Sequence, residues 1–400
     1  MTLPLEDLNV LELAEAAAGP LTTMLFADFG AEVVKVERPG VGDILRQYEP
    51  KTDGVAGYYL WANRNKRGIS VDVKSEEGRE IILELAEKAD VILENYRPGV
   101  VDELGVGYED VRERNEDVIY CHVSGFGQSG PYRDRKAIDH SMQGESGVMS
   151  ITGFPDRPAK AGFVYTDITT SLYNAFALLA AVEHRRKTGE GGEMDMPMWD
   201  VQVLNLGLHG YRYLMTGEVS ERMGTKYPAV VPYQAFETKD GEWVNVCAIT
   251  QRHWKEYCEE VIDRPDLVDH PDYATNQLRI ENREDLEPIL EAEMQELTRE
   301  EAMEALWETG IPSSPVNSIE EVVEHPQTDH RDMITTADHA VLGEIDMIGF
   351  PGQMDAIEPE MRHAPPAHGE HTESVLRELG YDETTIQNYL DNGVVERHEE

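Results

Sequence analysis

The segment Asn9–Glu37 reads NVLELAEAAAGPLTTMLFADFGAEVVKVE and decides the fold class of the chain. Its two ends, Asn9–Leu13 and Glu32–Glu37, are short and largely apolar, as expected of strands that are buried on both faces. Between them, Pro20 stands at a plausible first helical position and Gly30 at a plausible helix end. Two buried strands joined by a helix predict a β-α-β unit of a parallel sheet.

The same alternation of strand and helix patterns continues through the first 130 residues. Further strand candidates are Ile69–Val73, Val91–Asn95 and Val118–Ser124, and Ser75 is a plausible N-cap for a helix over Glu76–Lys88. This order predicts an α/β fold with a doubly wound, mostly parallel, Rossmann-like sheet.

A long helix is expected next, over about Ile168–Lys187, with Thr166 or Asp167 as its N-cap and Gly189 just beyond its end. A second helix is expected over Met198–Met215. Apolar residues recur at helical spacing along the first of these helices, at Leu172, Phe176, Leu179 and Val182.

The character of the chain changes near Pro228. Two strand-like runs, Tyr233–Thr238 and Trp243–Cys247, flank Lys239-Asp240-Gly241-Glu242 and predict a hairpin. Helical, very acidic stretches follow. We therefore expect a large domain from residues 1–200, a linker at 201–224, a smaller α+β domain at 225–325, and a segment at 326–400 that returns to the large domain.

The charge of the chain is extreme, with 78 acidic against 35 basic residues and a net charge of −43. This excludes general nucleic-acid binding, which needs basic surface, and argues against anionic membranes. The acids are interleaved with apolar residues, which indicates a folded protein with an acidic surface. Molar salt shortens the Debye length to roughly 3 Å and screens the self-repulsion. We therefore expect the high-salt cytoplasm of a halophile.

Other features agree with a cytoplasmic protein. The three cysteines are scattered and form no disulfide or metal-binding pattern. The chain opens with the acidic sequence MTLPLEDLNV, which does not resemble a signal peptide. The longest apolar run, Ala175–Val182, is too short for a bilayer span.

The basic residues are concentrated in one part of the chain. Residues 1–140 hold 16 of the 35, whereas residues 261–400 hold 8 and contain no lysine. Many of these cations follow predicted strands, which is where ligands of open α/β sheets bind. They predict a phosphorylated ligand. The cations concerned are Arg38, Arg64, Lys66, Arg67, Lys74, Arg97, Arg133, Arg135 and Lys136.

Two motifs suggest other functions and are set aside. Gly125–Gly130 fits the G-x-G-x-x-G pattern of dinucleotide-binding proteins, but Pro131 follows at once and no apolar-periodic helix opens there. His363, His368 and His371 lie in a proline-containing stretch, which is typical of a surface loop rather than a metal site. We expect no metal.

Asp167 has two interpretations that the local sequence leaves open. An aspartate at a helix start often only caps the free N–H groups. The positive end of a long helix also favours an ionised carboxylate. Such a carboxylate, held against a thioester away from water, can attack it and form a mixed anhydride.

Motifs spread over nearly the whole chain resemble those of the class III CoA-transferases. This family includes formyl-CoA transferase, carnitine CoA-transferase and α-methylacyl-CoA racemase. The matching motifs are Ala18-Gly-Pro20, Phe29-Gly-Ala-Glu-Val-Val-Lys-Val-Glu-Arg-Pro39, Gly42-Asp43, Asn63-Arg-Asn-Lys-Arg67, Glu94-Asn-Tyr-Arg-Pro-Gly99, Ser124-Gly-Phe-Gly-Gln-Ser-Gly-Pro131, Thr166-Asp-Ile168, Gly310-Ile-Pro312, Gly369-Glu-His-Thr372 and Glu378-Leu-Gly-Tyr381.

The resemblance implies an interlocked homodimer in which each chain forms a ring threaded by the other. It implies CoA and acyl-CoA as substrates, with no permanently bound cofactor, and it places the nucleophile at Asp167. The CoA contacts that it implies are Ala16, Arg38, Val71, Lys74, Asn95, Tyr96, Lys136 and Asp139.

The acids that are exchanged are expected by analogy with family members of halophilic archaea. These often act on C4–C5 dicarboxylates, such as succinyl-CoA with mesaconate. Arg46, Arg64 and Tyr48 are then candidates to meet the second carboxylate.

The chain departs from the family pattern at several positions. Glu103 stands where many relatives carry an arginine, and Arg97 is the candidate to replace that phosphate contact. Ala17 and Tyr48 replace a glutamine and a tryptophan of the formyl-CoA transferases, and Val230–Gln251 lacks their glycine-rich loop. An oxalate or formyl substrate is therefore not expected.

Two alternatives to CoA transfer stay open. His140 lies close in sequence to the position of the histidine that serves as acid or base in the racemases of the family. A non-catalytic CoA-binding protein would follow if Asp167 were only a helix cap.

Overall fold

The computed structural model describes residues 3–352, 354–357, 359 and 361–398. The chain divides into two compact units, which are described separately. The large unit contains Met1–Val148, Ala161–Gly217 and Pro326–Glu400, and the small unit contains Met149–Lys160 and Glu218–His325.

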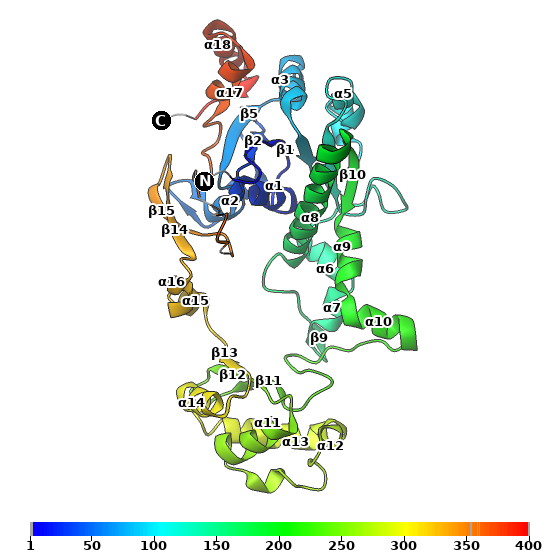
Figure 1. The fold of residues 1–400 in the computed structure, drawn as a ribbon, viewed down its shortest axis with the longest axis vertical. Coiled ribbons are helices and arrows are strands. Elements are labelled where there is room, and N and C mark those ends of the chain that lie inside the picture. Colours follow the sequence, from blue (N-terminus) through cyan, green and yellow to red (C-terminus); the bar gives the residue numbers. More distant parts are fainter. Residues whose placement is uncertain (1–2, 353, 358, 360, 399–400) are drawn as a thin grey trace. The chain divides into compact units, whose positions relative to one another are not determined.

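The large unit is built on a twisted, mostly parallel sheet (Figure 1). Among the described residues it has seven strands in the order β10-β7-β6-β1-β2-β5-β16. Neighbouring strands are parallel except at the edge, where β16 pairs antiparallel with β5. The strands are β1 (Asn9–Leu13), β2 (Glu32–Glu37), β5 (Lys66–Val71), β6 (Val91–Glu94), β7 (Ile119–Ser124), β10 (Gly192–Pro197) and β16 (Val395–Glu396).

Counted along the chain, the six parallel strands have the order 3-2-1-4-5-6 of doubly wound nucleotide-binding sheets. The predicted fold class is therefore confirmed. The helices of this unit are α1 (Ala18–Asp28), η1 (Ile44–Gln47), α2 (Gly57–Ala62), α3 (Glu76–Lys88), α4 (Val100–Glu103), α5 (Tyr108–Arg112), α6 (Asp139–Glu145), α8 (Tyr165–Thr188), α9 (Met198–Asn205), α10 (Gly207–Thr216), α16 (Pro326–His330), α17 (Thr372–Leu379) and α18 (Glu383–Asp391).

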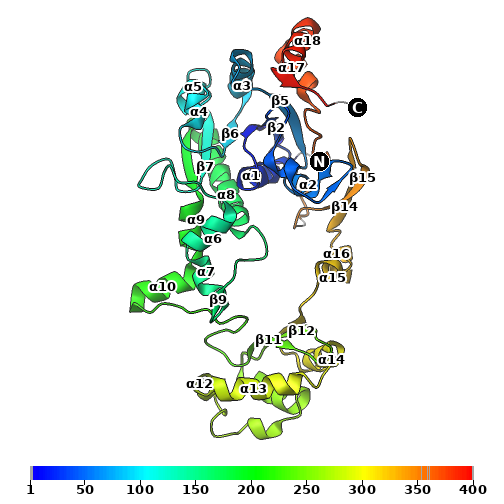
Figure 2. The ribbon, with the colours of Figure 1, turned by 180° about the vertical axis from the view of Figure 1, so that it is seen from behind.

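Helices cover both faces of the sheet because successive residues of a strand point to opposite sides. Leu11 of β1 belongs to the core under α3, α17 and α18. Its neighbour Val10 belongs to the core under α1 and α8. Figure 2 shows α17 and α18 beyond β5, on the side where the C-terminal segment returns to the sheet.

Local signals place the ends of several helices. The hydroxyl of Ser75 accepts a hydrogen bond from the N–H of Gly78, as its predicted cap role requires. Helix α1 begins at Ala18, so Pro20 is its third residue rather than its first. Gly30, just beyond that helix, has a φ of +108°.

The buried face of helix α8 is not the apolar face that the sequence predicts. Of the expected apolar residues, Val182 is buried, whereas Leu172 is 55% and Phe176 74% exposed. The buried face instead carries small and polar residues, including Ser171 and Asn174. The expected helix over 198–215 is broken into α9 and α10 at Gly207, whose φ is +49°.

Two short hairpins complete the large unit, and a separate core forms the small one. The hairpins are β3 (Lys51–Thr52) with β4 (Val55–Ala56), and β14 (Ile334–His339) with β15 (Gly343–Ile348). The elements of the small unit are β8 (Gly153–Phe154), β9 (Arg157–Pro158), β11 (Tyr233–Glu237), β12 (Trp243–Cys247), α11 (Gln251–Glu256), η2 (Tyr257–Val261), η3 (Pro265–Leu267), α12 (Asn276–Glu281), α13 (Arg283–Met294), α14 (Arg299–Thr309), β13 (Ser313–Pro315) and α15 (Ile319–Val323). Helix α7 (Val148–Ile151) spans the boundary.

The predicted hairpin of the small unit is confirmed as β11 and β12, to which β13 is added as a third strand. These strands pack through Phe236, Val244 and Val246 against a core around Trp254. None of the helices in the described part of the chain combines the length and the apolar character of a membrane span.

Candidate active site

The strand order reverses between β1 and β6, which makes a crevice beyond their carboxyl ends the expected ligand site. The residues that follow the two strands there are joined directly. The side-chain oxygen of Asn95 accepts from the N–H of Glu15 at 2.9 Å, and its amide nitrogen donates to the Glu15 carbonyl at 2.7 Å. Asn95, implied as a CoA contact, therefore holds the turn after β1.

The first turn of α8 lies beside this β1–α1 turn. The hydroxyl of Ser171 donates to the carbonyl oxygen of Ala18 at 2.8 Å, which ties α8 to the start of α1. Ile168 packs with Ala17 in a small apolar cluster. Asp167, the residue before Ile168, is thereby placed next to the switch point of the sheet.

Asp167 does not cap its own helix. Helix α8 begins at Tyr165, so Asp167 is its third residue. The N-cap position is occupied by Val164, whose side chain makes no capping hydrogen bond. The prediction of Thr166 or Asp167 as N-cap was therefore wrong. A carboxylate from α6 takes this role, because Asp139 accepts from both the N–H and the hydroxyl of Thr166 at 2.9 Å.

Asp139 is itself fixed by Gln143, one turn further along α6. The Gln143 amide donates to the second oxygen of Asp139 at 2.8 Å and accepts from the N–H of Ala161 at 2.9 Å. Both oxygens of Asp139 thus bond within the protein, whereas the resemblance implied a CoA contact for this residue. The cap frees the carboxylate of Asp167 for another use.

The surroundings of Asp167 favour its protonated form. Burial raises its pKa from 3.8 to about 7, and the negative charge of Asp139 adds to the increase. Burial and Asp139 thus act against the expected effect of the helix end, which favours the ionised carboxylate. A carboxyl group whose pKa is raised this far by burial is typical of a reactive site.

Three of the predicted ligand-binding cations remain available. Lys74, Arg97 and Lys136 are exposed, and no ion pair joins them to a carboxylate within the described ranges. Arg38 is half exposed and pairs with Glu15 at 2.9 Å. Lys74, Arg97 and Arg38 come shortly after the carboxyl ends of β5, β6 and β2, and Lys136 lies in the segment between β7 and α6.

Other predicted cations form ion pairs in the interior of the protein. Arg46 pairs with Glu37 at 2.7 Å, and Arg64 pairs with Asp28 at 2.6 Å, in both cases with little exposure. Contrary to expectation, neither guanidinium is placed to meet a substrate carboxylate. Lys66 is fully buried.

The remaining candidates differ in their access to ligand. The side chain of Val71 is fully buried in β5. Tyr96 is half-buried, and burial raises its pKa to about 12. Tyr48 is 49% exposed and lies edge-on to Tyr58. His140 is exposed on α6.

The glycine-rich loop Gly125–Gly130 does not open a helix, because the next helix starts at Asp139. It lacks the strand-turn-helix geometry of a dinucleotide site, as predicted. Two of its N–H groups are already bonded, Gly127 to the Ser124 hydroxyl and Gln128 to Asp195. No group of three or more metal-ligating side chains occurs among the described residues.

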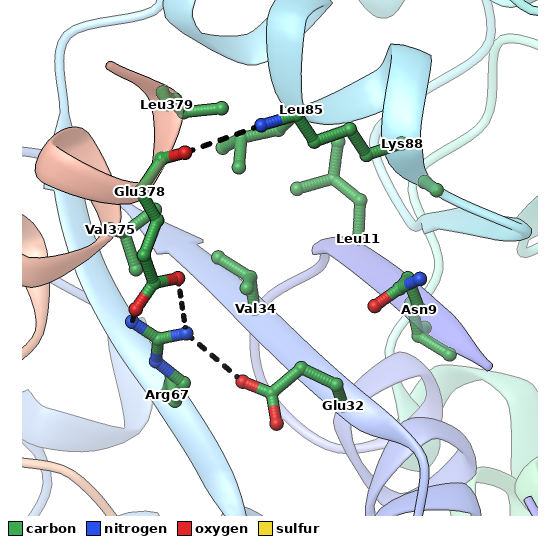
Figure 3. Close-up of a pocket in the computed structure, with 12 residues that line it drawn as sticks. Asn9, Leu11, Glu32, Val34, Arg67, Leu85, Lys88, Val375, Glu378 and Leu379 are labelled. Carbon is green, nitrogen blue, oxygen red and sulfur yellow. Dashed lines mark hydrogen bonds and ion pairs between the residues drawn. The ribbon is translucent and has the colours of Figure 1, made fainter. Parts of the chain in front are cut away.

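A cavity of about 110 Å³ lies at the opposite edge of the sheet, where β1 and β2 begin (Figure 3). Arg67 bonds there to Glu378 at 2.8 Å and to Glu32 at 3.2 Å. The side chains that line the cavity are mainly aliphatic. The cavity lies away from the carboxyl ends of the strands, so it takes no part in the candidate site. The lining residues are Asn9, Val10, Leu11, Glu32, Val34, Arg67, Leu85, Lys88, Ala89, Val375, Glu378 and Leu379.

Sequence reasoning missed the charged residues inside the sheet. Glu12 and Lys35 are fully buried in β1 and β2 and pair at 2.7 Å, and Asp43 lies within 2.8 Å of the same ammonium. The available signal was a charged residue in the middle of each apolar strand run. Buried charges of this kind are paired or functional.

The fold and this site define an α/β protein with a nucleotide-type binding edge and a half-buried carboxylate beside it. The model of CoA-transferase family III matches residues 5–372, so the chain belongs to this family. It is a CoA-transferase enzyme, for which CoA and its thioesters are substrates.

Individual relatives cover nearly the whole chain. Human succinyl-CoA:glutarate CoA-transferase is 38% identical over 99% of this chain and 91% of its own length. Succinyl-CoA:mesaconate CoA-transferase of Haloarcula hispanica is 38% identical over 94% of this chain and 96% of its own. A crystal structure of a CaiB/BaiF family protein from Brucella suis has a TM-score of 0.87 at 33% identity, covering 95% of this chain and all of that one.

Proposed function

We propose that the enzyme transfers CoA from succinyl-CoA to a C4–C5 dicarboxylic acid such as mesaconate, with Asp167 as the covalent carrier. The observation that carries this proposal is the state of Asp167. Its carboxylate is relieved of capping by Asp139, is buried enough to titrate at about 7, and lies beside the switch point of the sheet.

The proposed reaction begins when the ionised Asp167 attacks the thioester carbonyl of the donor. A carbon–oxygen bond forms, the carbon–sulfur bond breaks, and the CoA thiolate leaves with the electron pair. The thiolate then attacks the side-chain carbonyl of Asp167. This forms an aspartyl-CoA thioester and releases the donor acid as its carboxylate.

The acceptor repeats the exchange in reverse. Its carboxylate attacks the aspartyl thioester and releases the CoA thiolate, which then attacks the acceptor carbonyl of the new anhydride. The products are the acceptor thioester and the free carboxylate of Asp167. One thioester replaces another, so the site has only to lower barriers. Burial of Asp167 supports this by limiting hydrolysis of the anhydride.

The CoA moiety is proposed to bind across the carboxyl edge of the sheet. Lys74, Arg97 and Lys136 are exposed there and form no ion pair within the described part of the chain, and Arg38 is half exposed. In a chain of net charge −43, these are natural partners for phosphate groups.

The choice of acids rests on the relatives, which are named for succinyl-CoA with glutarate or mesaconate. Ala17 and Tyr48 depart from the formyl-CoA transferase pattern, which argues against oxalate. Tyr48 is half exposed and is the candidate contact for the acid.

A CoA-exchange assay in molar KCl tests this function. The protein is incubated with succinyl-CoA and, in separate reactions, mesaconate, glutarate, oxalate and acetate, and the new thioester is measured. Mesaconate or glutarate should be the best acceptor, and Asp167→Asn should abolish turnover. Asp200→Asn is the matched control, because Asp200 is also the third residue of its helix but is exposed. Normal turnover by Asp167→Asn would exclude the mechanism.

We also propose that the enzyme is an interlocked homodimer. The apolar residues of α8 and α10 support this, because large exposed apolar patches mark interaction sites. Leu208 is 79%, Leu214 78% and Met215 82% exposed, and α10 has no buried residue. Sedimentation should give a dimer, and a Leu208→Glu, Leu214→Glu variant should weaken it. A monomeric wild-type enzyme would contradict this.

The acidic surface supports the cytoplasm of a halophile as the place where the enzyme works. Salt screens the self-repulsion of a net charge of −43 and so favours a compact fold. Exchange activity that peaks in dilute buffer would contradict this assignment.

A further inference from the structure

The turn between β1 and α1 contains a strained residue at the centre of the ligand edge. Ala16 has a φ of +63°, a left-handed conformation that non-glycine residues rarely adopt. Such a conformation persists only when its surroundings hold it, and it occurs preferentially at functional sites. Ala16 follows the strand at which the sheet order reverses.

A buried carboxylate holds this residue. One oxygen of Asp43 accepts from the N–H of Ala16 at 3.1 Å and from the N–H of Leu45 at 2.8 Å. Asp43 is 0% exposed, so no water competes for these bonds. The strained turn after β1 is therefore tied to the segment that follows β2.

A buried ammonium holds the carboxylate in turn. Lys35 lies 2.8 Å from the second oxygen of Asp43 and 2.7 Å from an oxygen of Glu12. It also donates to the carbonyl of Ala14 at 2.7 Å. The ammonium thus donates hydrogen bonds to Glu12 and to the Ala14 carbonyl of the turn, and it forms an ion pair with Asp43, which anchors that turn. Glu12 is a buried residue of β1, so its ion pair with Lys35 also ties the ammonium to this strand.

The brace formed by Lys35 and Asp43 reaches the turn without touching Asp167. The first turn of α8 is capped separately by Asp139. Loosening the brace should therefore disturb ligand binding at the β1–α1 turn more than it disturbs the nucleophile.

We propose that Asp43 and Lys35 are positioning residues for acyl-CoA binding, which act by holding Ala16 in its left-handed conformation at the carboxyl edge of the sheet. This inference rests on the proposed function, because it assigns the turn to the binding of CoA. If Asp43 and Lys35 only stabilised the fold, the effect of replacing Asp43 on CoA binding would not depend on the backbone conformation of Ala16.

The test compares variants by the KM for succinyl-CoA, by kcat and by calorimetric binding of CoA. Asp43→Asn keeps the shape but weakens the hold on Ala16, and should raise KM and the CoA Kd about tenfold, with a smaller change in kcat. Asp43→Glu keeps the charge next to Lys35 but displaces the acceptor from the N–H of Ala16. It should fold stably and show the same loss of binding.

Adding Ala16→Gly to Asp43→Asn distinguishes positioning from general damage. Glycine adopts positive φ without strain, so the double variant should recover a large part of the lost affinity. Asp90→Asn is the matched control. Asp90 also bonds a backbone N–H, of Asn9 at 2.8 Å, and pairs with Arg185 at 2.6 Å, but it lies at the opposite edge of the sheet. It should leave KM unchanged.

Unchanged KM and Kd in both Asp43 variants would overturn the inference, as would a loss that Ala16→Gly does not relieve. These results are distinct from failure of the proposed function, which would appear as a wild-type enzyme that neither binds CoA nor exchanges it.

Discussion

Replacement of Asp167, the proposed nucleophile, should stabilise the folded protein at neutral pH while it abolishes activity. Asp167 has a pKa of about 7 in the folded protein and an ordinary value of 3.8. Between these values the folded state keeps a proton that the unfolded chain has lost, so ionisation of Asp167 destabilises the fold as the pH rises. Asp167→Asn removes this effect, because its side chain does not titrate.

The size of the effect follows from the interval between the two pKa values. A difference of about 3 between the two pKa values means that ionisation of Asp167 lowers the free energy of unfolding by about 4 kcal/mol. This full loss is reached above pH 7. At pH 5.5 about half of it is already present. The stability advantage of Asp167→Asn over the wild type should therefore grow by about 2 kcal/mol between pH 5.5 and pH 8.5.

Urea unfolding of both proteins in molar KCl, followed at several pH values, measures this difference. Asp200→Asn serves as the control, because the exposed carboxylate on α9 should give no comparable pH dependence. A difference between wild type and Asp167→Asn that stays constant over this pH range would refute the reasoning. It would mean that Asp167 titrates at its ordinary pKa in the folded protein.

Four further outcomes are expected. The kcat/KM of exchange should rise with pH and level off above about 7, because the attacking form of Asp167 is the ionised one; a profile that is flat from pH 5.5 to 8.5 would contradict this. Asp139→Asn removes a negative charge that raises the pKa of Asp167, so the midpoint of the profile should move to lower pH. Val34→Ile should raise the free energy of unfolding by about 0.5–2 kcal/mol by filling the cavity that Val34 lines, and denaturant unfolding in molar KCl would measure it. The free energy of unfolding should rise with KCl into the molar range, since added salt screens the net charge of −43; equal stability in dilute buffer would exclude this.

Much of the fold could be predicted from the sequence, because the strands of a parallel sheet are short buried runs between helices. β1 and β2 have the predicted bounds, and the hairpin of β11 and β12 follows from its turn residues. The helix starts were harder to predict. Asp167 resembles an N-cap, but the cap of α8 comes from Asp139, 27 positions before the Thr166 that it caps, and such a distant contact has no local sequence signal.

The site was predicted in part for a related reason. Cations beyond strand ends could be located, but their availability depends on partners that only the fold brings together. Arg46 and Arg64 meet Glu37 and Asp28 in the interior, whereas Lys74 stays exposed. The exposure of Leu172, Phe176 and Leu179 was also unexpected, because apolar spacing alone cannot distinguish a core from a surface that a partner covers.

Direct chemical trapping tests the central claim, which is that Asp167 carries the acyl group and CoA. The enzyme is mixed with succinyl-CoA, treated with hydroxylamine or borohydride, digested and analysed by mass spectrometry. The account predicts modification of the peptide that contains Asp167, dependent on succinyl-CoA, together with no modification in Asp167→Asn and an unchanged yield in Asp200→Asn. Rapid exchange with an unmodified Asp167, or trapping at another carboxylate, would contradict it.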